Sequence, residues 1–88
     1  MSLDSYREQI DNIDGELLRL FTERMEVSRL VALYKKEHGL PVLNAERESE
    51  VLSTVEEKTD AVLCSYALKL YTTILEVSRE YQEDIING

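Results

Sequence analysis

The chain has 88 residues, enough for one small domain spanning residues 1–88. Its 18 acidic and 10 basic side chains give a formal net charge of −8, which argues against a nucleic-acid surface because such a surface needs clustered basic residues. A composition of 43% hydrophobic and 32% charged residues is typical of a folded rather than a disordered chain.

The composition also argues against two further classes of protein. No apolar run approaches the roughly 20 residues that span a bilayer, and the N-terminal residues lack the apolar stretch of a signal peptide. The single cysteine, Cys64, and the single histidine, His38, rule out a disulfide framework and argue against a structural zinc site. We therefore expect a cytoplasmic protein, and we assign no chemistry to either side chain.

The first predicted element is one long helix over residues 3–36. This stretch has no proline and only one glycine, Gly15, and its apolar residues recur at helical rather than alternating spacing. Asp4 or Ser5 can cap its start, and Ser5 with Glu8 has the spacing of a capping box.

The end of this helix is marked by Lys35 and Lys36, which favour the last turn. Gly39 is a candidate for the left-handed residue that stops a helix, and Pro41 follows two residues later.

A second, shorter helix is predicted over residues 44–57. Asn44 is a good N-cap, and Glu46 and Glu48 suit the positive end of the helix dipole. The pattern resets around residues 58–60, where Thr59 or Asp60 can cap a third helix that runs to about residue 86. The apolar spacing thus predicts an all-α fold of one long, one short and one medium-long helix.

The length of the first helix indicates a dimer. A helix of about 34 residues spans roughly 50 Å, whereas a compact globule of this chain length has a radius of gyration of only about 12 Å. The long helix must therefore extend beyond its own domain, and the two shorter helices cannot cover its whole apolar stripe. A second copy can, so we expect an intertwined homodimer.

Polar side chains occupy positions where the helical period calls for apolar ones. On the first helix, Arg24, Ser28 and Lys35 share one face with Val31, because eleven residues make almost three turns. On the third helix, Ser78 and Gln82 continue an apolar stripe by one and two turns. At the start of the second helix, Arg47 and Glu48 lie next to Asn44.

Each of these residues alone has a plain structural interpretation. Arg24 can pair with a nearby glutamate or extend to solvent, and Lys35 suits a helix C-terminus. Asn44 can be an N-cap only, and Ser78 can be a small packing residue. Together, however, two or more inward-facing cations without matching acids indicate an anionic ligand, most simply a carboxylate, since buried unpaired charges are costly.

The same residues resemble the all-helical (AroQ-class) chorismate mutases. The resemblance covers nearly the whole chain, and its signatures lie on all three helices with consistent separations. They are Tyr6-Arg7-Glu8-Gln9-Ile10, Glu23-Arg24, Lys35, residues 41–48 and Ser78-Arg79-Glu80-Tyr81-Gln82. The resemblance implies an intertwined dimer that converts chorismate to prephenate by a Claisen rearrangement, in phenylalanine and tyrosine biosynthesis, without metal or organic cofactor.

The resemblance also implies roles for individual residues. Arg24 would bind one substrate carboxylate, and Arg7 of the partner subunit would bind the other. Lys35 would contact a carboxylate and the ether oxygen of the breaking bond, and Gln82 would donate a hydrogen bond to the same oxygen. Ser78 would support a carboxylate.

The polar end of the site would be shaped by Arg47 and Glu48, with Glu48 holding the ring hydroxyl. One position departs from the family pattern, because Asn44 stands where many members have Asp. Asparagine caps a helix about as well, so the departure bears on the hydroxyl contact and its charge balance rather than on the fold.

Helix geometry independently favours a site shared between two chains. Arg7 lies seventeen residues before Arg24, roughly 25 Å along the same helix, and points about 100° away around the axis. One small diacid cannot touch both arginines of a single straight helix.

Two alternatives stay open. Isochorismate-pyruvate lyase uses a similar site to eliminate pyruvate from the isomeric acid, and a non-catalytic helical dimerisation or regulatory module could retain the family's appearance. Sequence also leaves open whether the chain acts alone or was cut from a fused bifunctional enzyme, and how it is regulated.

Overall fold

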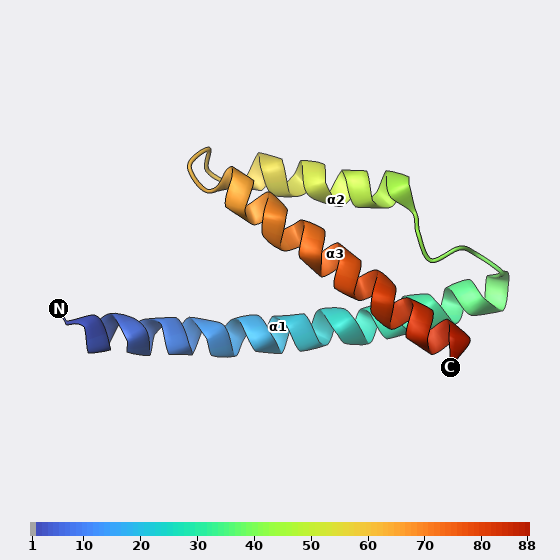
Figure 1. Cartoon of the computed structure of the whole chain (residues 1–88), viewed down its shortest axis with the longest axis horizontal. Helices are drawn as coiled ribbons and strands as arrows, with labels where there is room; N and C mark the ends of the chain where they lie inside the picture. Colours follow the sequence, from blue (N-terminus) through green and yellow to red (C-terminus); the bar gives the residue numbers. More distant parts are fainter. Residues whose placement is uncertain (1) are drawn as a thin grey trace.

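The computed structural model describes residues 2–88, which form three α-helices joined by short loops (Figure 1). α1 spans Leu3–His38, α2 spans Ala45–Lys58 and α3 spans Cys64–Asn87. The predicted sequence of one long, one short and one medium-long helix is therefore confirmed. No helix in this part of the chain combines the length and the apolar character needed to cross a membrane.

Two of the predicted helix signals are confirmed in detail. Gly39 ends α1 in the left-handed conformation, with φ at 65°, and its backbone N–H donates to the Lys35 carbonyl. Asn44 caps α2, where its side-chain oxygen accepts from the backbone N–H of Arg47 at 3.0 Å. These caps fix the loop between α1 and α2, which places the α2 N-terminus near the end of α1.

The predicted cap at the start of α1 is wrong. Ser2 rather than Asp4 or Ser5 is the N-cap, and its hydroxyl accepts from the backbone N–H of Ser5 at 3.1 Å. Ser2 has extended backbone angles and lies three residues before Ser5, as an N-cap requires. The helix therefore begins one turn earlier than the Ser5–Glu8 capping box would place it.

The predicted cap of α3 is also wrong. Thr59 ends α2, and its hydroxyl donates to the Val55 carbonyl of the preceding turn. Asp60 opens a turn closed by the Leu63 N–H, which donates to the Asp60 carbonyl at 3.0 Å. Leu63 then precedes α3 without a side-chain cap, so this turn delays the third helix to Cys64.

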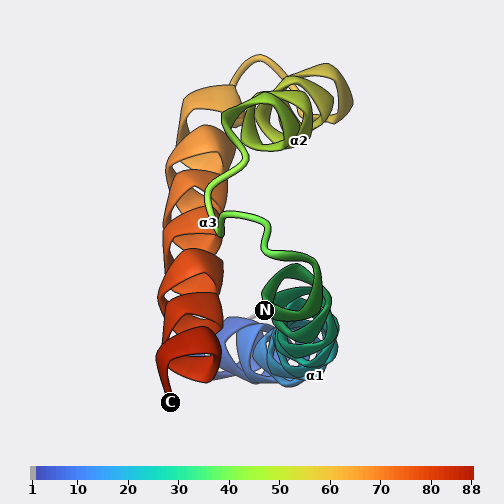
Figure 2. The same cartoon turned by 90° about the vertical axis from the view of Figure 1, so that its right-hand side faces the viewer.

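α3 packs against both α1 and α2, and it crosses α1 near the C-terminal end of α1 (Figures 1 and 2). The N-terminal part of α1 extends past the other two helices (Figure 1). The molecule measures 54 × 27 × 14 Å with a radius of gyration of 16.1 Å, well above the roughly 12 Å of a compact globule of this length. The predicted projection of the long helix beyond its own domain is thus confirmed.

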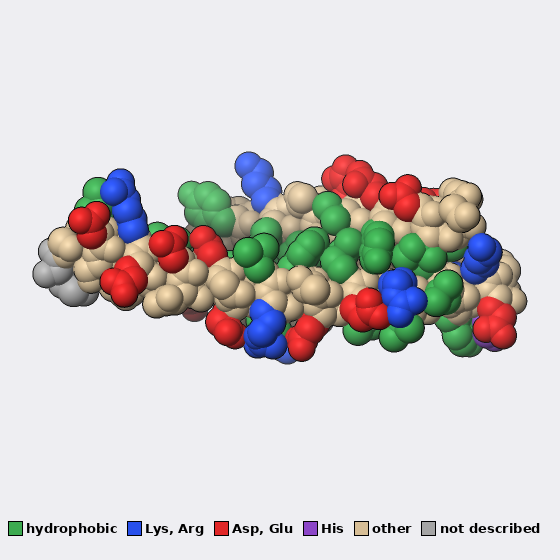
Figure 3. All heavy atoms as spheres, turned by 90° about the horizontal axis from the view of Figure 1, so that it is seen from below, with side chains coloured by type: hydrophobic (Ala, Val, Ile, Leu, Met, Phe, Trp, Pro, Cys, Tyr) green, Lys and Arg blue, Asp and Glu red, His purple; other side chains and the backbone are tan. Residues whose placement is uncertain are grey.

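The single chain has little hydrophobic core. Among residues 2–88, only Ala32 and Leu75 are buried hydrophobic side chains, and they lie where α1 meets α3. The accessible surface is 6955 Å², about 1,600 Å² more than the ~5,300 Å² expected of a compact monomer of this mass. Figure 3 shows hydrophobic side chains gathered over the middle and right-hand part of one face. Exposed apolar residues of α1 include Leu3, Tyr6, Ile10, Ile13, Leu17, Leu20, Phe21, Val27 and Leu30.

Candidate active site

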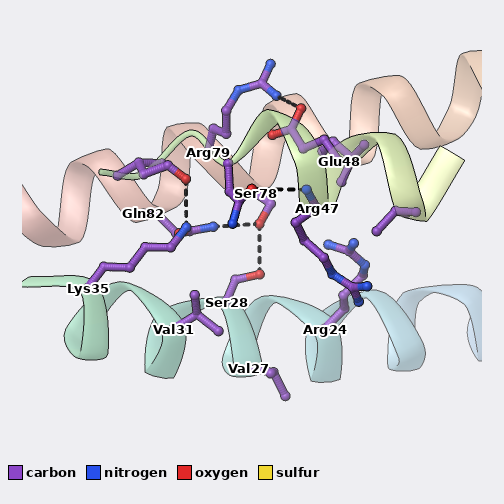
Figure 4. Close-up of a pocket in the computed structure, with 14 residues that line it drawn as sticks. Arg24, Val27, Ser28, Val31, Lys35, Arg47, Glu48, Ser78, Arg79 and Gln82 are labelled. Atoms are coloured by element: carbon purple, nitrogen blue, oxygen red, sulfur yellow. Dashed lines mark hydrogen bonds and ion pairs between the residues drawn. The ribbon is translucent and has the colours of Figure 1, made fainter. Parts of the chain in front are cut away.

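A pocket of about 340 Å³ lies between the three helices, a size at the small end of ligand sites (Figure 4). α1 forms one side, α3 the opposite side, and the start of α2 the end. Its polar lining comprises Arg24, Ser28 and Lys35 from α1, Asn44, Arg47 and Glu48 from the start of α2, and Ser78, Arg79 and Gln82 from α3.

Lys35 reaches across the pocket from the last turn of α1. Its ammonium donates to the backbone carbonyl of Val42 at 2.7 Å and to the side-chain oxygen of Gln82 at 3.0 Å. Both acceptors are neutral. Among residues 2–88, no carboxylate pairs with Lys35, so its third N–H and its net charge remain available to a ligand.

Gln82 and Ser78 form a buried polar pair on α3, one turn apart. Each is only 7% exposed, and the Gln82 amide nitrogen donates to the Ser78 hydroxyl at 3.1 Å. The Ser78 hydroxyl also lies 2.9 Å from the hydroxyl of Ser28 on α1. A chain of hydrogen bonds therefore lines the wall of the pocket. It starts at Ser28 on α1, passes through Ser78 and Gln82 on α3, and returns to α1 at Lys35.

Arg24 and Arg47 extend toward each other at the other end of the pocket (Figure 4). Arg24 has no ion-pair partner within the described part of the chain, and Arg47 has only Glu50, 3.5 Å away on the exposed face of α2. Two neighbouring guanidinium groups repel each other unless an anion lies between them. A carboxylate accepts bidentate hydrogen bonds from such groups, which makes this end a natural carboxylate site.

Glu48 is the acidic member of the polar lining. It pairs with Arg79 across the α2–α3 interface, 31 residues away in sequence, and both side chains are partly buried. The hydrogen bond to the Glu48 carboxylate raises the pKa of the Arg79 guanidinium above its usual value, with burial acting in the opposite direction. Arg79 thus stays charged and holds the carboxylate at the pocket edge.

Arg7 is the one predicted site residue that the chain does not bring to the pocket. It lies on the free N-terminal part of α1, where its side chain is 66% exposed and 3.9 Å from Asp4. The other seven predicted residues all line the pocket: Arg24, Lys35, Asn44, Arg47, Glu48, Ser78 and Gln82.

Three groups of the pocket were not predicted as site residues. Ser28 shares the helical face of Arg24 and Lys35, and a buried serine on such a face is a signal that could have identified it. Arg79 directly follows Ser78, but its pairing with Glu48 depends on how α2 lies against α3. The Val42 carbonyl is backbone and carries no sequence signal.

The Arg79–Glu48 pair gives a prediction about stability. Arg79→Met should lower the free energy of unfolding by about 1 kcal/mol, because it leaves a mostly buried carboxylate without its cation. Arg29→Met is the matched control, since Arg29 pairs with a single carboxylate, that of Glu26, along the surface of one helix, and it should therefore cost less.

Urea unfolding at equal chain concentration measures both variants, since stability that depends on association varies with concentration. Equal losses for Arg79→Met and Arg29→Met would contradict a special contribution from the α2–α3 pair.

Comparison with known proteins gives a family match over most of the chain. The family model for chorismate mutase type II matches residues 6–83. A chorismate mutase of Methanocaldococcus jannaschii is 27% identical over 86 residues, which cover 96% of this chain and 87% of that protein. No solved structure shows a significant match.

Other relatives are much longer proteins. The T-protein of Haemophilus influenzae is 41% identical over 51 residues, covering 58% of this chain and 14% of the relative. A bifunctional chorismate mutase/prephenate dehydratase of Aquifex aeolicus is 36% identical over 53 residues, covering 60% of this chain and 15% of the relative. The aligned segments therefore span about a seventh of these longer proteins.

Proposed function

Because the chain belongs to the chorismate mutase type II family, we propose that it catalyses the Claisen rearrangement of chorismate to prephenate in the pocket between its three helices. One observation carries the proposal most directly. Arg24 and Lys35 line the same pocket without a carboxylate partner among residues 2–88, which suits a ligand that brings its own carboxylates.

The rearrangement places particular demands on a site. It is pericyclic, so it needs no nucleophile and no proton-transfer base. It is accelerated by holding the enolpyruvyl chain folded over the ring, and by donors that stabilise negative charge growing on the ether oxygen as its bond lengthens. Arg24 and Ser78 would hold carboxylates, while Lys35 and Gln82 would face the ether oxygen.

Gln82 and Lys35 each keep one donor hydrogen for this role. Its oxygen accepts from Lys35 and its nitrogen donates to Ser78, so one amide hydrogen and one ammonium hydrogen remain for the substrate. Both donors are already held in place before binding, as electrostatic stabilisation of a transition state requires.

The ring hydroxyl of the substrate would bind beside Glu48, at the start of α2. In this proposal Glu48 accepts the hydroxyl hydrogen, and Arg47 balances the charge. Asn44 uses its side-chain oxygen to cap α2, so its amide nitrogen remains the group available to the substrate.

We propose further that the active form is an intertwined homodimer. The excess surface of about 1,600 Å² per chain corresponds to about 3,200 Å² for two chains, within the range of obligate dimer interfaces. The apolar residues exposed along α1 are the surface that a second copy would cover. A cytoplasmic location belongs to the same proposal, consistent with a chain whose only cysteine is Cys64.

The dimer would also complete the site. Arg7 belongs to the first turns of α1, and the N-terminal part of this helix extends past the other two helices (Figure 1). It is roughly 25 Å from Arg24 along the helix axis. Arg7 of the partner subunit can reach the pocket, whereas Arg7 of the same chain cannot. The substrate's second carboxylate would bind to Arg7 of the partner subunit.

The test is to add purified protein to chorismate, follow the loss of its ultraviolet absorbance and identify the product. The proposal predicts prephenate. If chorismate is unchanged and isochorismate releases pyruvate instead, the chain is a lyase of the same fold. If neither acid reacts while the protein is folded, the catalytic proposal is wrong.

A further inference from the structure

Ser28 is a buried residue that the proposed reaction does not use directly. It lies on α1 with 7% of its surface exposed, and its hydroxyl is 2.9 Å from that of Ser78 on α3. It lies one turn before Ala32, which is fully buried between the same two helices. Since Ala32 packs at this crossing with only a methyl group, a small side chain is sufficient for packing there. The hydroxyl group of Ser28 therefore needs an explanation other than packing.

The direction of each hydrogen bond beyond Ser28 follows from donor and acceptor chemistry. The Lys35 ammonium can only donate, so the Gln82 atom that faces it is the side-chain oxygen. The Gln82 nitrogen must then face Ser78 and donate to it, as the 3.1 Å contact records. Lys35 thus fixes the orientation of the Gln82 amide, and Ser78 accepts from it.

Ser78 has one hydrogen and two lone pairs. If Ser78 donates to Ser28, it has no hydrogen left for a ligand. If Ser28 donates, Ser78 accepts from both protein partners and its own hydrogen is free to point into the pocket. A carboxylate can only accept hydrogen bonds, so a carboxylate ligand beside Ser78 selects the second arrangement.

We propose that Ser28 is a positioning residue: it donates to Ser78, which directs the Ser78 hydrogen toward the substrate carboxylate and holds Gln82 in register with Lys35. This inference rests on the proposed function for its kinetic consequence. Linked hydrogen bonds also strengthen one another in a buried setting, so loss of Ser28 should loosen Gln82 as well as Ser78.

The kinetic test is a double-mutant cycle. Ser28→Ala should lower kcat/KM for chorismate about three- to tenfold, the range of one neutral hydrogen bond, whereas Ser28→Ala added to Ser78→Ala should cause no further loss. Ser53→Ala is the control, because Ser53 is an exposed serine within α2. An equal loss from Ser28→Ala with and without Ser78 would mean that Ser28 acts through packing, and would overturn the proposal.

A second readout needs no substrate. The chain has two glutamines, Gln9 and Gln82, and three asparagines, so the spectra of Gln9→Ala and Gln82→Ala assign the two glutamine side-chain amides in a ¹⁵N NMR spectrum. Ser28→Ala should shift the Gln82 signals and speed exchange of its amide hydrogens with water severalfold. The exposed Gln9 signals should not move.

The two readouts separate this proposal from the proposed function. If the wild-type protein does not convert chorismate, the reaction is wrong, and the Gln82 signals still decide whether Ser28 organises the network. Unchanged Gln82 signals in Ser28→Ala would overturn the positioning role even in an active enzyme.

Discussion

Replacing Lys35 with alanine is expected to lower kcat for chorismate at least a hundredfold. The Lys35 ammonium is held by two neutral acceptors, Val42 and Gln82, so its charge is available to the ether oxygen. Removing one such donor from a site shielded from water typically costs about 3–4 kcal/mol of transition-state stabilisation. Steady-state kinetics on the purified variant measures the loss.

Lys36→Ala is the matched control for this experiment. Lys36 lies in the same last turn of α1 but is exposed and does not line the pocket. Its activity should remain near that of the wild type, and thermal unfolding at equal concentration should show that both variants fold. A Lys35→Ala enzyme with near-normal kcat would refute the role assigned to the ammonium.

Replacing Gln82 with glutamate is expected to produce an enzyme that is poor at pH 7.5 and recovers as the pH falls. A carboxylate beside the ether oxygen repels the negative charge that develops there, whereas a protonated carboxyl can donate a hydrogen bond. The protonated fraction grows as the pH falls through the pKa of the new carboxyl. Activity relative to the wild type should therefore increase toward acidic pH.

The comparison variant for the pH profile is Gln82→Ala. It removes the donor without adding a titratable group, so its activity relative to the wild type should not change across the same pH range. A flat ratio for Gln82→Glu would contradict the placement of Gln82 beside the developing charge. The wild-type profile is measured alongside, so that changes common to all three enzymes cancel.

Local sequence signals predicted the fold where a single residue decides the outcome. Near the end of α1, only Gly39 can adopt the left-handed backbone conformation without strain. At the start of α2, Asn44 is the only residue that was predicted as the N-cap. The predicted N-caps of α1 and α3 were wrong because several neighbouring polar residues could each have served as the cap. The start of α3 is set by the turn of residues 60–63. This turn is closed by a backbone hydrogen bond from Leu63 to Asp60, which the pattern of side chains does not predict.

The candidate site was predictable to the extent that helical periodicity determines it. Arg24 and Lys35 share a face of α1, and Ser78 and Gln82 share a face of α3, so each pair could be placed from spacing alone. The contacts between helices could not be predicted from spacing. The Ser28–Ser78 bond joins residues 50 positions apart, and the Arg79–Glu48 pair depends on how α2 lies against α3.

Subunit complementation tests most directly whether two chains together build each site. Arg7→Ala and Lys35→Ala are each expected to be nearly inactive as homodimers. In a mixed dimer, one site combines the intact Lys35 of one chain with the intact Arg7 of the other. The second site carries both defects.

The measurement is chorismate turnover after the two variants are unfolded together, in equal amounts, and refolded. The shared site predicts recovery to about a quarter of wild-type activity, since half of randomly paired dimers are mixed and each mixed dimer holds one intact site. If the refolded mixture is no more active than the separately refolded variants, each site is built from one chain, which contradicts a shared site.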